Sequence, residues 1–346
     1  MNAECDKSGP RTPKTAPSTP LQTRKVSFLL GAAFAVIVVV TMQAGLHVIE
    51  MVRRPDLTVL SNRIDLDRIM QNDPDTFWSL QPNLKDAEFQ PQPGGPPRPF
   101  HVSTNELGLR NPPMLEKGGR FRVLAVGDST TFGQYVEDSE SWPAQLQDLL
   151  DRDRSDIDVV NAGLIGASSF QGLSYLLKRG FDLKPDAVIA TYGFNEQGGW
   201  SITDRQGSAL LSHERLGGMI SAFVQRRQKA SPTPVTRVSP GEFLDVLLIM
   251  AHECEARGVM LLLVLWPHPD QITGDWNRLL SYQPLVLEAA SRTHAKIIDL
   301  RRPFHDSTEP VLVDIVHASP AGCRIAAMET KAVLTANFPQ LQSISK

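Results

Sequence analysis

From residue 120 onward, short and nearly continuous apolar runs alternate along the chain with longer amphipathic stretches. Apolar runs of four to eight residues without a polar face are typical of strands that are buried on both sides, as in a parallel sheet. The pattern predicts five such strands, at Phe121–Val126, Ile157–Val160, Ala187–Tyr192, Val259–Trp266 and Ala295–Leu300.

The amphipathic stretches between these runs have the length and period of helices, which we expect near 142–152, 169–180, 240–257, 276–293 and 320–337. Ser239 and Pro240 form a helix start signal, Gly258 a stop signal, and Ser319-Pro320 repeats the start signal. Strand–helix alternation predicts one doubly wound α/β domain. Residues 197–239 interrupt the alternation with a GG pair, the segment SPTPVTRVSP and one expected helix at 212–228, so we interpret them as an insertion or lid.

Ahead of this domain lies a stretch without charge, from Val26 to Ile49. Its 24 residues would reach about 36 Å as a helix, enough to cross a hydrocarbon core of about 30 Å. We therefore predict a transmembrane anchor at 26–49, with a cleaved signal peptide and a buried core helix as the alternatives. Residues 1–25 carry five bases and two acids and are expected to form a disordered basic tail on the inner side of the membrane. Residues 50–117 show no sustained period, include the Pro-rich QPQPGGPPRP, and are interpreted as a juxtamembrane and linker segment.

Charge and cysteine content narrow the possible functions of the 346-residue chain. The net charge of −3 argues against a nucleic-acid partner, because phosphate binding needs a basic surface. Cys5, Cys254 and Cys323 are too few and too scattered for a disulfide framework or a zinc cluster. The sequence also contains no Walker A loop and no H-E-x-x-H, so we expect neither a cofactor nor a metal.

Polar residues that are suited to acyl chemistry follow the predicted strands, where sites form in open parallel sheets. Ser129 follows the first strand, Gly163 the second and Asn195 the third, while Asp314 and His317 follow the fifth after a loop. A serine is a potential nucleophile, a histidine a general base, and an aspartate fixes the tautomer of that histidine. Glycine N–H and asparagine amide groups are suitable donors to an oxyanion.

These blocks resemble those of the SGNH, or GDSL-type, hydrolases: VLAVGDSTTFG, VVNAGLIG, YGFNE and DIVHASPAG, in that order. The resemblance covers roughly residues 118–340 of the domain that we place at 118–346, and it implies a flavodoxin-like sheet of about five parallel strands. It also implies a catalytic triad of Ser129, Asp314 and His317, and an oxyanion hole formed by Ser129, Gly163 and Asn195. Glu196 and Cys323 depart from residues that are common in the family. The segment FHVSTNELGLRNPP (100–113) resembles a stretch that precedes the domain in membrane-anchored bacterial members.

Each candidate also has a structural interpretation. Ser129 is a suitable N-cap, and Gly163 and Asn195 are suitable turn residues. His305 is the main rival to His317, because it also follows the last strand and adjoins Asp306, but it lacks the D-x-x-H spacing.

The other prominent side chains near these blocks favour structural roles. We interpret Asp128 as a turn-stabilising carboxylate, Trp142 as core packing, and residues 100–113 with Arg110 as a strand and turn packed on the sheet edge, with a cover over the site as the alternative. Trp266 and His268 end the fourth strand, where they would either line an acyl or sugar pocket or serve packing alone.

Together the blocks and the anchor predict a membrane-anchored serine esterase with its catalytic domain on the extracytoplasmic, periplasmic side. The expected partners are the membrane and a small-molecule, glycan or lipid ester substrate, and the cell envelope favours carbohydrate esters. Two alternatives remain: an acyltransferase of the same fold, and a non-catalytic glycan-binding or assembly module.

Overall fold

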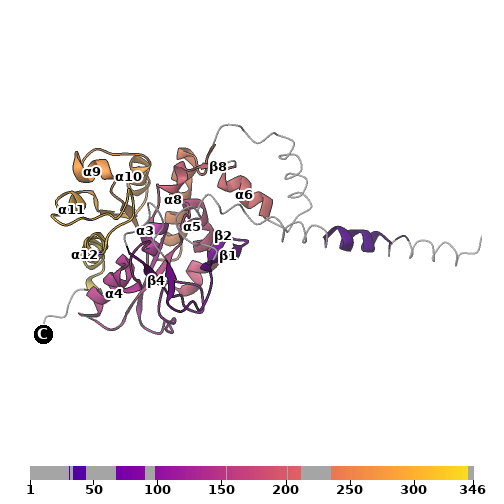
Figure 1. The fold of residues 1–346 in the computed structure, drawn as a ribbon, viewed down its shortest axis with the longest axis horizontal. Coiled ribbons are helices and arrows are strands. Elements are labelled where there is room, and N and C mark those ends of the chain that lie inside the picture. The colour runs from indigo at the N-terminus through magenta and orange to yellow at the C-terminus, as the bar shows by residue number, and fades with distance from the viewer. Residues whose placement is uncertain are drawn as a thin grey trace, which may run out of the picture. The chain divides into compact units, whose positions relative to one another are not determined.

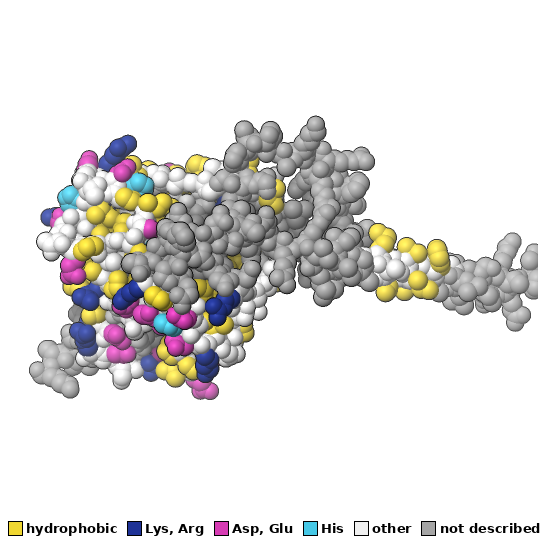
Figure 2. Space-filling view, in the orientation of Figure 1, with side chains coloured by type: hydrophobic (Ala, Val, Ile, Leu, Met, Phe, Trp, Pro, Cys, Tyr) yellow, Lys and Arg dark blue, Asp and Glu magenta, His cyan; other side chains and the backbone are white. Residues whose placement is uncertain are grey.

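The computed structural model describes residues 31, 34–43, 68–89, 98–152, 154–200, 202–211 and 235–341. The predicted tail at 1–25 lies outside this part of the chain, as does most of the predicted anchor at 26–49. Residues 34–43 form a helix with exposed apolar side chains, which Figure 2 shows in yellow. No helix of the described part is long and apolar enough to cross a membrane, so the anchor stays a prediction.

The predicted doubly wound α/β domain is present (Figure 1). Its five-stranded parallel sheet has the order β11-β10-β7-β5-β6. This is the flavodoxin-like order, in which the second strand lies outside the first. All five predicted strands are confirmed within a few residues: β5 (Phe121–Gly127), β6 (Ile157–Gly163), β7 (Ala187–Thr191), β10 (Met260–Leu265) and β11 (Lys296–Asp299).

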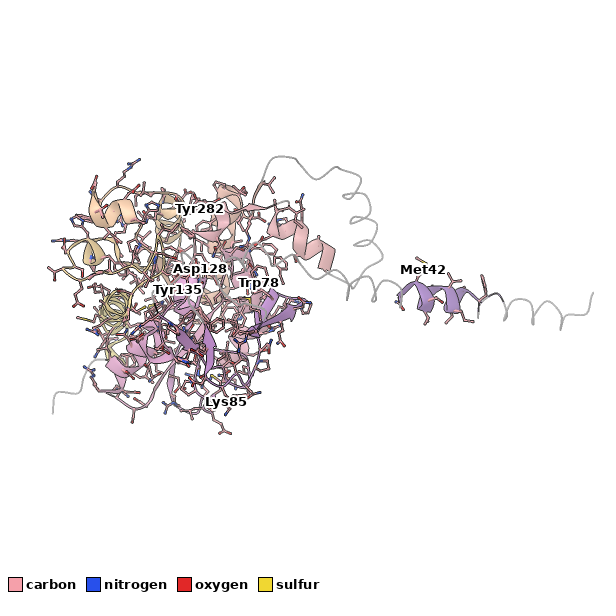
Figure 3. The ribbon with its side chains drawn as sticks, viewed as in Figure 1. Met42, Trp78, Lys85, Asp128, Tyr135 and Tyr282 are labelled. Atoms are coloured by element: carbon pink, nitrogen blue, oxygen red, sulfur yellow. The ribbon has the colours of Figure 1, made fainter. Side chains whose placement is uncertain are left out.

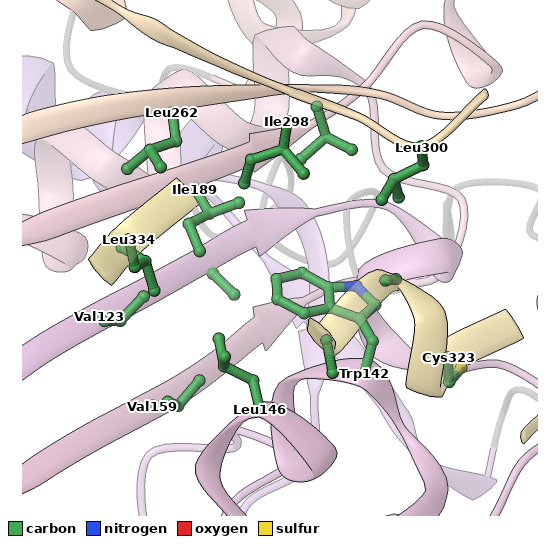
Figure 4. Close-up of a cluster of buried hydrophobic side chains, with 14 of the residues drawn as sticks. Val123, Trp142, Leu146, Val159, Ile189, Leu262, Ile298, Leu300, Cys323 and Leu334 are labelled. Atoms are coloured by element: carbon green, nitrogen blue, oxygen red, sulfur yellow. The ribbon is translucent and has the colours of Figure 1, made fainter. Parts of the chain in front are cut away.

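Helices cover both faces of the sheet, because alternate side chains of each strand point to opposite sides. Val123 and Ala125 of β5 join one buried cluster with helices α4 (Trp142–Asp151) and α12 (Pro320–Asn337), which lie side by side in Figure 1. Trp142 lies in this cluster beside Leu146 (Figure 4), as the core interpretation predicted. Leu124 and Val126 point the other way into a second cluster with α8 (Pro240–Glu255) and α10 (Gln283–Ser291).

Two predicted start signals act as caps in the structure. The Ser239 side chain accepts a hydrogen bond from the Glu242 N–H, and that of Ser319 accepts one from the Gly322 N–H. Helix α10 begins at Gln283 and not near 276. The remaining short helices are α3 (Ser129–Phe132), α5 (Ser169–Tyr175), α9 (Pro269–Thr273), α11 (Arg301–His305) and the helical turns Asp138–Glu140, Leu176–Gly180, Phe181–Leu183, Asn195–Gln197 and Pro339–Leu341.

Four short strands precede the domain, where the sequence showed no sustained period. They form two antiparallel pairs, β1 (Met70–Asp73) with β2 (Phe77–Leu80) and β3 (Ala87–Phe89) with β4 (Phe100–Val102). Their apolar side chains share a third buried cluster with residues that follow the domain's first two strands, including Phe132, Tyr135 and Ile165. This part of the predicted linker is therefore packed onto the domain.

Arg110 joins this segment to the domain from a fully buried position, which bears out the packing interpretation. Its guanidinium donates to the Asp138 carboxylate at 2.7 Å and lies 4.6 Å from the centre of the Phe132 ring. It also donates to four backbone carbonyls, those of His101, Phe132, Gly133 and Val136. One side chain thus fixes the loop that follows α3.

Side-chain amides cover the open edge of the sheet along β6. Gln147 accepts from the Val159 N–H at 2.6 Å and donates to the Ile157 carbonyl at 3.0 Å. Asn111 donates to the Val159 carbonyl at 2.9 Å and accepts from the Asn161 N–H. Four backbone groups of β6 therefore have partners outside the sheet.

The insertion leaves and rejoins the domain through a small antiparallel pair, β8 (Gly199–Trp200) with β9 (Val235–Thr236). Helix α6 (Asp204–Leu211) follows β8, where no helix was predicted. Residues 212–234, which contain the whole helix expected at 212–228, lie outside the described part.

Candidate active site

Ser129 lies at the carboxyl end of β5, at the first position of the short helix α3. Asp128 caps this helix, because its carboxylate accepts from the Thr130 N–H at 2.8 Å and from the Thr130 hydroxyl at 2.7 Å. Burial raises the pKa of Asp128, and these hydrogen bonds oppose that effect. The capping contacts fit the turn-stabilising role that the sequence indicated for Asp128, which Figure 3 labels in the middle of the domain.

His317 bridges Ser129 and Asp314. Its Nε2 atom lies 2.8 Å from the Ser129 Oγ, and its Nδ1 atom lies 2.8 Å from the Asp314 Oδ2. The other carboxylate oxygen of Asp314 accepts from the N–H groups of Val316 and His317, at 2.9 and 2.8 Å. The D-x-x-H spacing thus lets one carboxylate hold both the backbone and the ring of the histidine.

Two effects of opposite sign act on the Asp314 carboxyl. Burial on its own would raise its pKa, but the hydrogen bond and charge of His317 and two backbone N–H groups outweigh burial and lower the pKa to about 2. Asp314 is therefore a carboxylate at neutral pH and favours a proton on the Nδ1 atom of His317.

Packing further restricts the His317 ring. Tyr135 packs edge-on against it, with ring centroids 4.9 Å apart, and the Trp266 indole donates to the neighbouring Val316 carbonyl at 2.8 Å. His305, the rival in the sequence, lies in α11, where its Nδ1 atom is 3.0 Å from the Ile272 carbonyl oxygen. The structure therefore brings His317, and not His305, to Ser129.

Gly163 ends β6 next to α3. Its N–H donates to the Asn161 side chain at 3.0 Å, and a Cβ atom at this position would lie 2.1 Å from the Phe132 nitrogen. Glycine is thus required here because the helix that carries Ser129 packs directly on the strand. The N–H that the sequence suggested as an oxyanion donor already has a partner in this structure.

The turn after β6, Leu164–Ala167, contains a second glycine that the sequence analysis did not single out. Gly166 has a φ angle of +71°, which favours glycine, and its N–H has no hydrogen-bond partner in the part of the chain that the structure describes. Asn195 donates to the Ala167 carbonyl of this turn at 2.9 Å, and its amide nitrogen lies 3.5 Å from the Asp128 carboxylate. The Ser129 N–H, at the start of α3, also lacks a partner among the described residues.

A small cavity of about 50 Å³ lies on the side of β7 and β10, and its lining includes Asp128 and Thr130, which flank Ser129 in the sequence. Its lining is mostly apolar and includes Tyr192, Phe194, Trp266, Tyr282 and Val316. His268 also lines it, so both residues that end the fourth predicted strand face this cavity. The exposed side chains of Phe194 and Ile315 contribute to its lining.

Glu196 follows Asn195 and is fully buried. Burial raises its pKa to about 7, although the N–H groups of Ser169 and Gly193 donate to its carboxylate at 2.6 and 2.9 Å. It thereby joins the start of α5 to the loop that carries Asn195. Among the described residues, no group of three His, Cys, Asp or Glu side chains could hold a metal ion.

Comparison with known proteins shows similarity to three chains of related description. An arylesterase of Vibrio mimicus is 31% identical over 75 residues, which are 22% of this chain and 38% of that protein, so the match spans little more than a third of the relative. A putative lipolytic protein of the G-D-S-L family from Desulfitobacterium hafniense is 19% identical, with a TM-score of 0.42 over 62% of this chain and 100% of that one. The acetyl xylan esterase AlAXEase is 15% identical, with a TM-score of 0.44 over 62% of this chain and 100% of that one.

A family model covers far more of the chain than the curated relative does. The model of the GDSL-like lipase/acylhydrolase family matches residues 125–325, more than half of the sequence, and includes Ser129, Asn195, Asp314 and His317. The chain therefore belongs to the GDSL-like lipase/acylhydrolase family and is a hydrolase.

Proposed function

We propose that the protein is a serine esterase whose nucleophile is Ser129, whose general base is His317 and whose orienting carboxylate is Asp314. The observation that carries this proposal is the continuous chain of two 2.8 Å contacts from Ser129 Oγ through the imidazole to Asp314 Oδ2. A serine hydroxyl becomes a strong nucleophile when a positioned base removes its proton during attack.

The reaction proceeds in two stages. His317 Nε2 takes the proton of Ser129 as Oγ bonds to the ester carbonyl carbon, and it then gives that proton to the departing alcohol. Water next attacks the acyl-enzyme, with His317 again taking one proton and returning it to Ser129 as the acid leaves. Asp314, ionised because its pKa is about 2, stabilises the imidazolium that forms in each stage.

The oxyanion hole of this proposal consists of the Ser129 N–H, the Asn195 amide and a backbone N–H that follows β6. The Asn195 amide has two N–H bonds, so it can keep its contact with the Ala167 carbonyl and release only the long 3.5 Å contact with Asp128. Gly163 was the predicted third donor, but its N–H would first have to leave the Asn161 side chain. We therefore propose that the Gly166 N–H, which has no partner among the described residues, acts in its place. The loss of one such donor reduces rates by about 10²–10³.

The small apolar cavity favours a short acyl group, such as acetyl, carried by a small-molecule, glycan or lipid alcohol. An acyltransferase would use the same acyl-enzyme and differ only in the acceptor that attacks it. The intact contacts of Ser129 with His317 argue against a non-catalytic glycan-binding module, since such a module needs no activated serine.

The test is hydrolysis of 4-nitrophenyl acetate by the full-length protein, together with fluorophosphonate labelling, and the Ser129→Ala variant is the control. We expect labelled wild type, unlabelled Ser129→Ala and release of nitrophenol by the wild type alone. A wild type that neither labels nor hydrolyses would leave the binding module as the better description. Faster nitrophenol release on addition of an alcohol or glycan acceptor, with acylated acceptor as product, would favour the transferase.

We also propose that residues 26–49 anchor the protein and place the hydrolase domain on the extracytoplasmic side. The support is the 24-residue uncharged stretch after a basic tail. A reporter that is active only in the cytoplasm, fused after Lys346, is expected to give no signal. A bright reporter would reverse the orientation.

A further inference from the structure

Three side chains from distant parts of the sequence hold successive carbonyl groups of the turn Leu164–Ala167. The Trp78 indole N–H donates to the Ile165 carbonyl at 3.0 Å, and the Arg237 guanidinium donates to the Gly166 carbonyl at 2.6 Å. Asn195 holds the third, that of Ala167. Of these three side chains, only Asn195 belongs to the blocks that carry the family resemblance. Trp78 lies outside residues 125–325, which the family model matches.

The first of these contacts sets the direction of an N–H group. A trans peptide unit is planar, so its C=O and N–H bonds point in opposite directions. The Ile165 carbonyl and the Gly166 N–H belong to one such unit, and the described residues contain no cis peptide bond. A donor that fixes the carbonyl on one side of the turn therefore fixes the Gly166 N–H toward the other side.

The contact of Arg237 fixes the orientation of the next peptide unit, which joins Gly166 to Ala167. The Arg237 contact fixes the Gly166 carbonyl, and the Ala167 N–H of that unit donates to the Leu164 carbonyl at 3.0 Å. Both peptide planes that flank the Cα atom of Gly166 are thus held. A glycine in the left-handed region has wide conformational freedom of its own, so the turn needs such restraints to keep one geometry.

We propose that Trp78 and Arg237 are positioning residues that preorganise the Gly166 N–H as an oxyanion donor. This inference rests on the proposed esterase function. It assigns a role in catalysis to the segment before the hydrolase domain and to the returning end of the insertion. Preorganised donors are effective because they need no rearrangement when charge develops on the substrate.

Both holders are themselves rigidly placed. Trp78 is fully buried in the cluster that contains Phe100, Phe132 and Tyr135. Arg237 is 1% exposed, and its guanidinium lies 5.7 Å from the centre of the Trp78 ring.

The charge of Arg237 is also balanced within the domain. Asp204 accepts from Arg237 with both carboxylate oxygens at 2.9 Å, and the Gln171 side chain accepts from the same guanidinium at 2.6 Å. Breaking such a buried pair by removing one partner is strongly destabilising. A conservative replacement is therefore the appropriate probe at this position.

A purely structural explanation is that these side chains only satisfy buried carbonyls. The two explanations differ in what a small change does to kcat. Trp78→Phe replaces the indole by a smaller phenyl ring, so it removes the N–H that holds the peptide unit and still leaves an aromatic side chain in the cluster. If the unit positions an oxyanion donor, kcat should fall more than loss of packing alone can explain.

The experiment compares full-length wild type, Trp78→Phe and Phe100→Leu in steady-state hydrolysis of 4-nitrophenyl acetate, with thermal melting of each. Phe100 lies in the same buried cluster but holds no carbonyl of the turn, so Phe100→Leu is the matched packing control. For Trp78→Phe we expect kcat to fall by about 10²-fold with KM nearly unchanged. Small displacements of groups that contact the reacting atoms cause rate losses of this size. The inflection of its pH–rate profile should equal that of wild type, because the contact between Ser129 and His317 is intact.

Wild-type kcat in Trp78→Phe would overturn the inference, as would an equal loss of kcat in Phe100→Leu at equal melting temperature. If Trp78→Phe does not fold, Arg237→Lys decides by the same criteria, since lysine keeps the positive charge opposite Asp204 but lacks the planar fork. A wild type without hydrolysis would contradict the esterase proposal itself, which separates that failure from a failure of the positioning role.

Discussion

His317 Nε2 lies 2.8 Å from Ser129 Oγ, although the two residues are 188 positions apart in the chain. Ser129 follows β5 and His317 follows the loop after β11, so the parallel sheet delivers both to its carboxyl edge. The distance between the two atoms therefore depends on the register of the whole sheet. Any change that shifts β5 relative to β11 would separate them.

The first prediction concerns this pair. Ser129→Ala and His317→Ala should each abolish most hydrolysis of an aryl acetate, and the double variant should be scarcely worse than either, because residues that act as a unit are not additive. Steady-state kinetics of the three full-length variants, with melting curves for each, measure this. His305→Ala is the control and should remain near wild type; an inactive His305→Ala beside an active His317→Ala would show that the base is misassigned.

The second prediction concerns Asp314 in catalysis. Asp314→Asn keeps a group of similar shape beside the Nδ1 atom of His317 but no longer favours a proton there, so kcat should fall by less than in His317→Ala. The measurement is kcat on the same aryl acetate. A variant as active as wild type would exclude an orienting role for this carboxylate.

The third prediction concerns acid stability. The pKa of Asp314 is lowered from 3.8 to about 2, so the stability that its carboxylate contributes is present above pH 4 and is lost as pH falls through about 2. That contribution is about 2 kcal/mol. Urea unfolding between pH 2 and 6 should show this loss in wild type and a flatter curve in Asp314→Asn. Parallel curves would mean that the carboxylate does not contribute.

The fourth prediction compares two arginines. Arg110 is buried and donates to four carbonyls and a carboxylate, so Arg110→Met should reduce the free energy of unfolding by about 3–5 kcal/mol. Arg98 pairs with Glu140 on the surface, with 56% of its side chain exposed, and Arg98→Met should cost less than about 1 kcal/mol. Urea unfolding measures both free energies. Equal losses of stability in the two variants would contradict the conclusion that Arg110 holds the segment before the domain and the loop after α3 together.

The fifth prediction concerns Gly163. A Cβ atom there would overlap backbone atoms of α3, which cannot move as a flexible side chain would, so Gly163→Ala should destabilise the fold by about 3 kcal/mol and lower kcat by displacing Ser129. Gly241→Ala is the control, because a Cβ atom at that helical position meets nothing within 4 Å. It should be neutral or stabilise by up to about 1 kcal/mol. Thermal melting and kinetics of both variants provide the comparison.

The sheet and its larger helices could be predicted because their signals are local. Continuous apolar runs located all five parallel strands, and Ser-Pro pairs located the starts of α8 and α12. The strands β1 to β4 escaped detection because segments of three or four residues are too short to show a period. The start of α10 was misplaced because residues 276–282 mix apolar and polar side chains as an amphipathic helix does. The helix begins only at Gln283, next to Pro284, which is favoured in the first turn of a helix and disfavoured in its interior.

The residues of the candidate site also fall into those that the sequence could predict and those that it could not. The D-x-x-H block of the family resemblance implied that Asp314 orients His317, and the structure places the two side chains 2.8 Å apart. No pattern pointed to Trp78 or Arg237, because their partners are backbone carbonyls, which every residue has. Gly166 was not distinguished from Gly163, since only the three-dimensional structure shows which N–H already has a partner.

The amides of Asn111 and Gln147 along β6 have a consequence for how copies of this chain can meet. An uncovered outer strand is a template onto which a second molecule adds its own strand, the first step of ordered aggregation. Because the carbonyls of Ile157 and Val159 and the N–H groups of Val159 and Asn161 are already engaged, this stretch of β6 is a poor template for a second strand. A double replacement of Asn111 and Gln147 by alanine would therefore be expected to increase self-association before it affects the chemistry at the far ends of the strands.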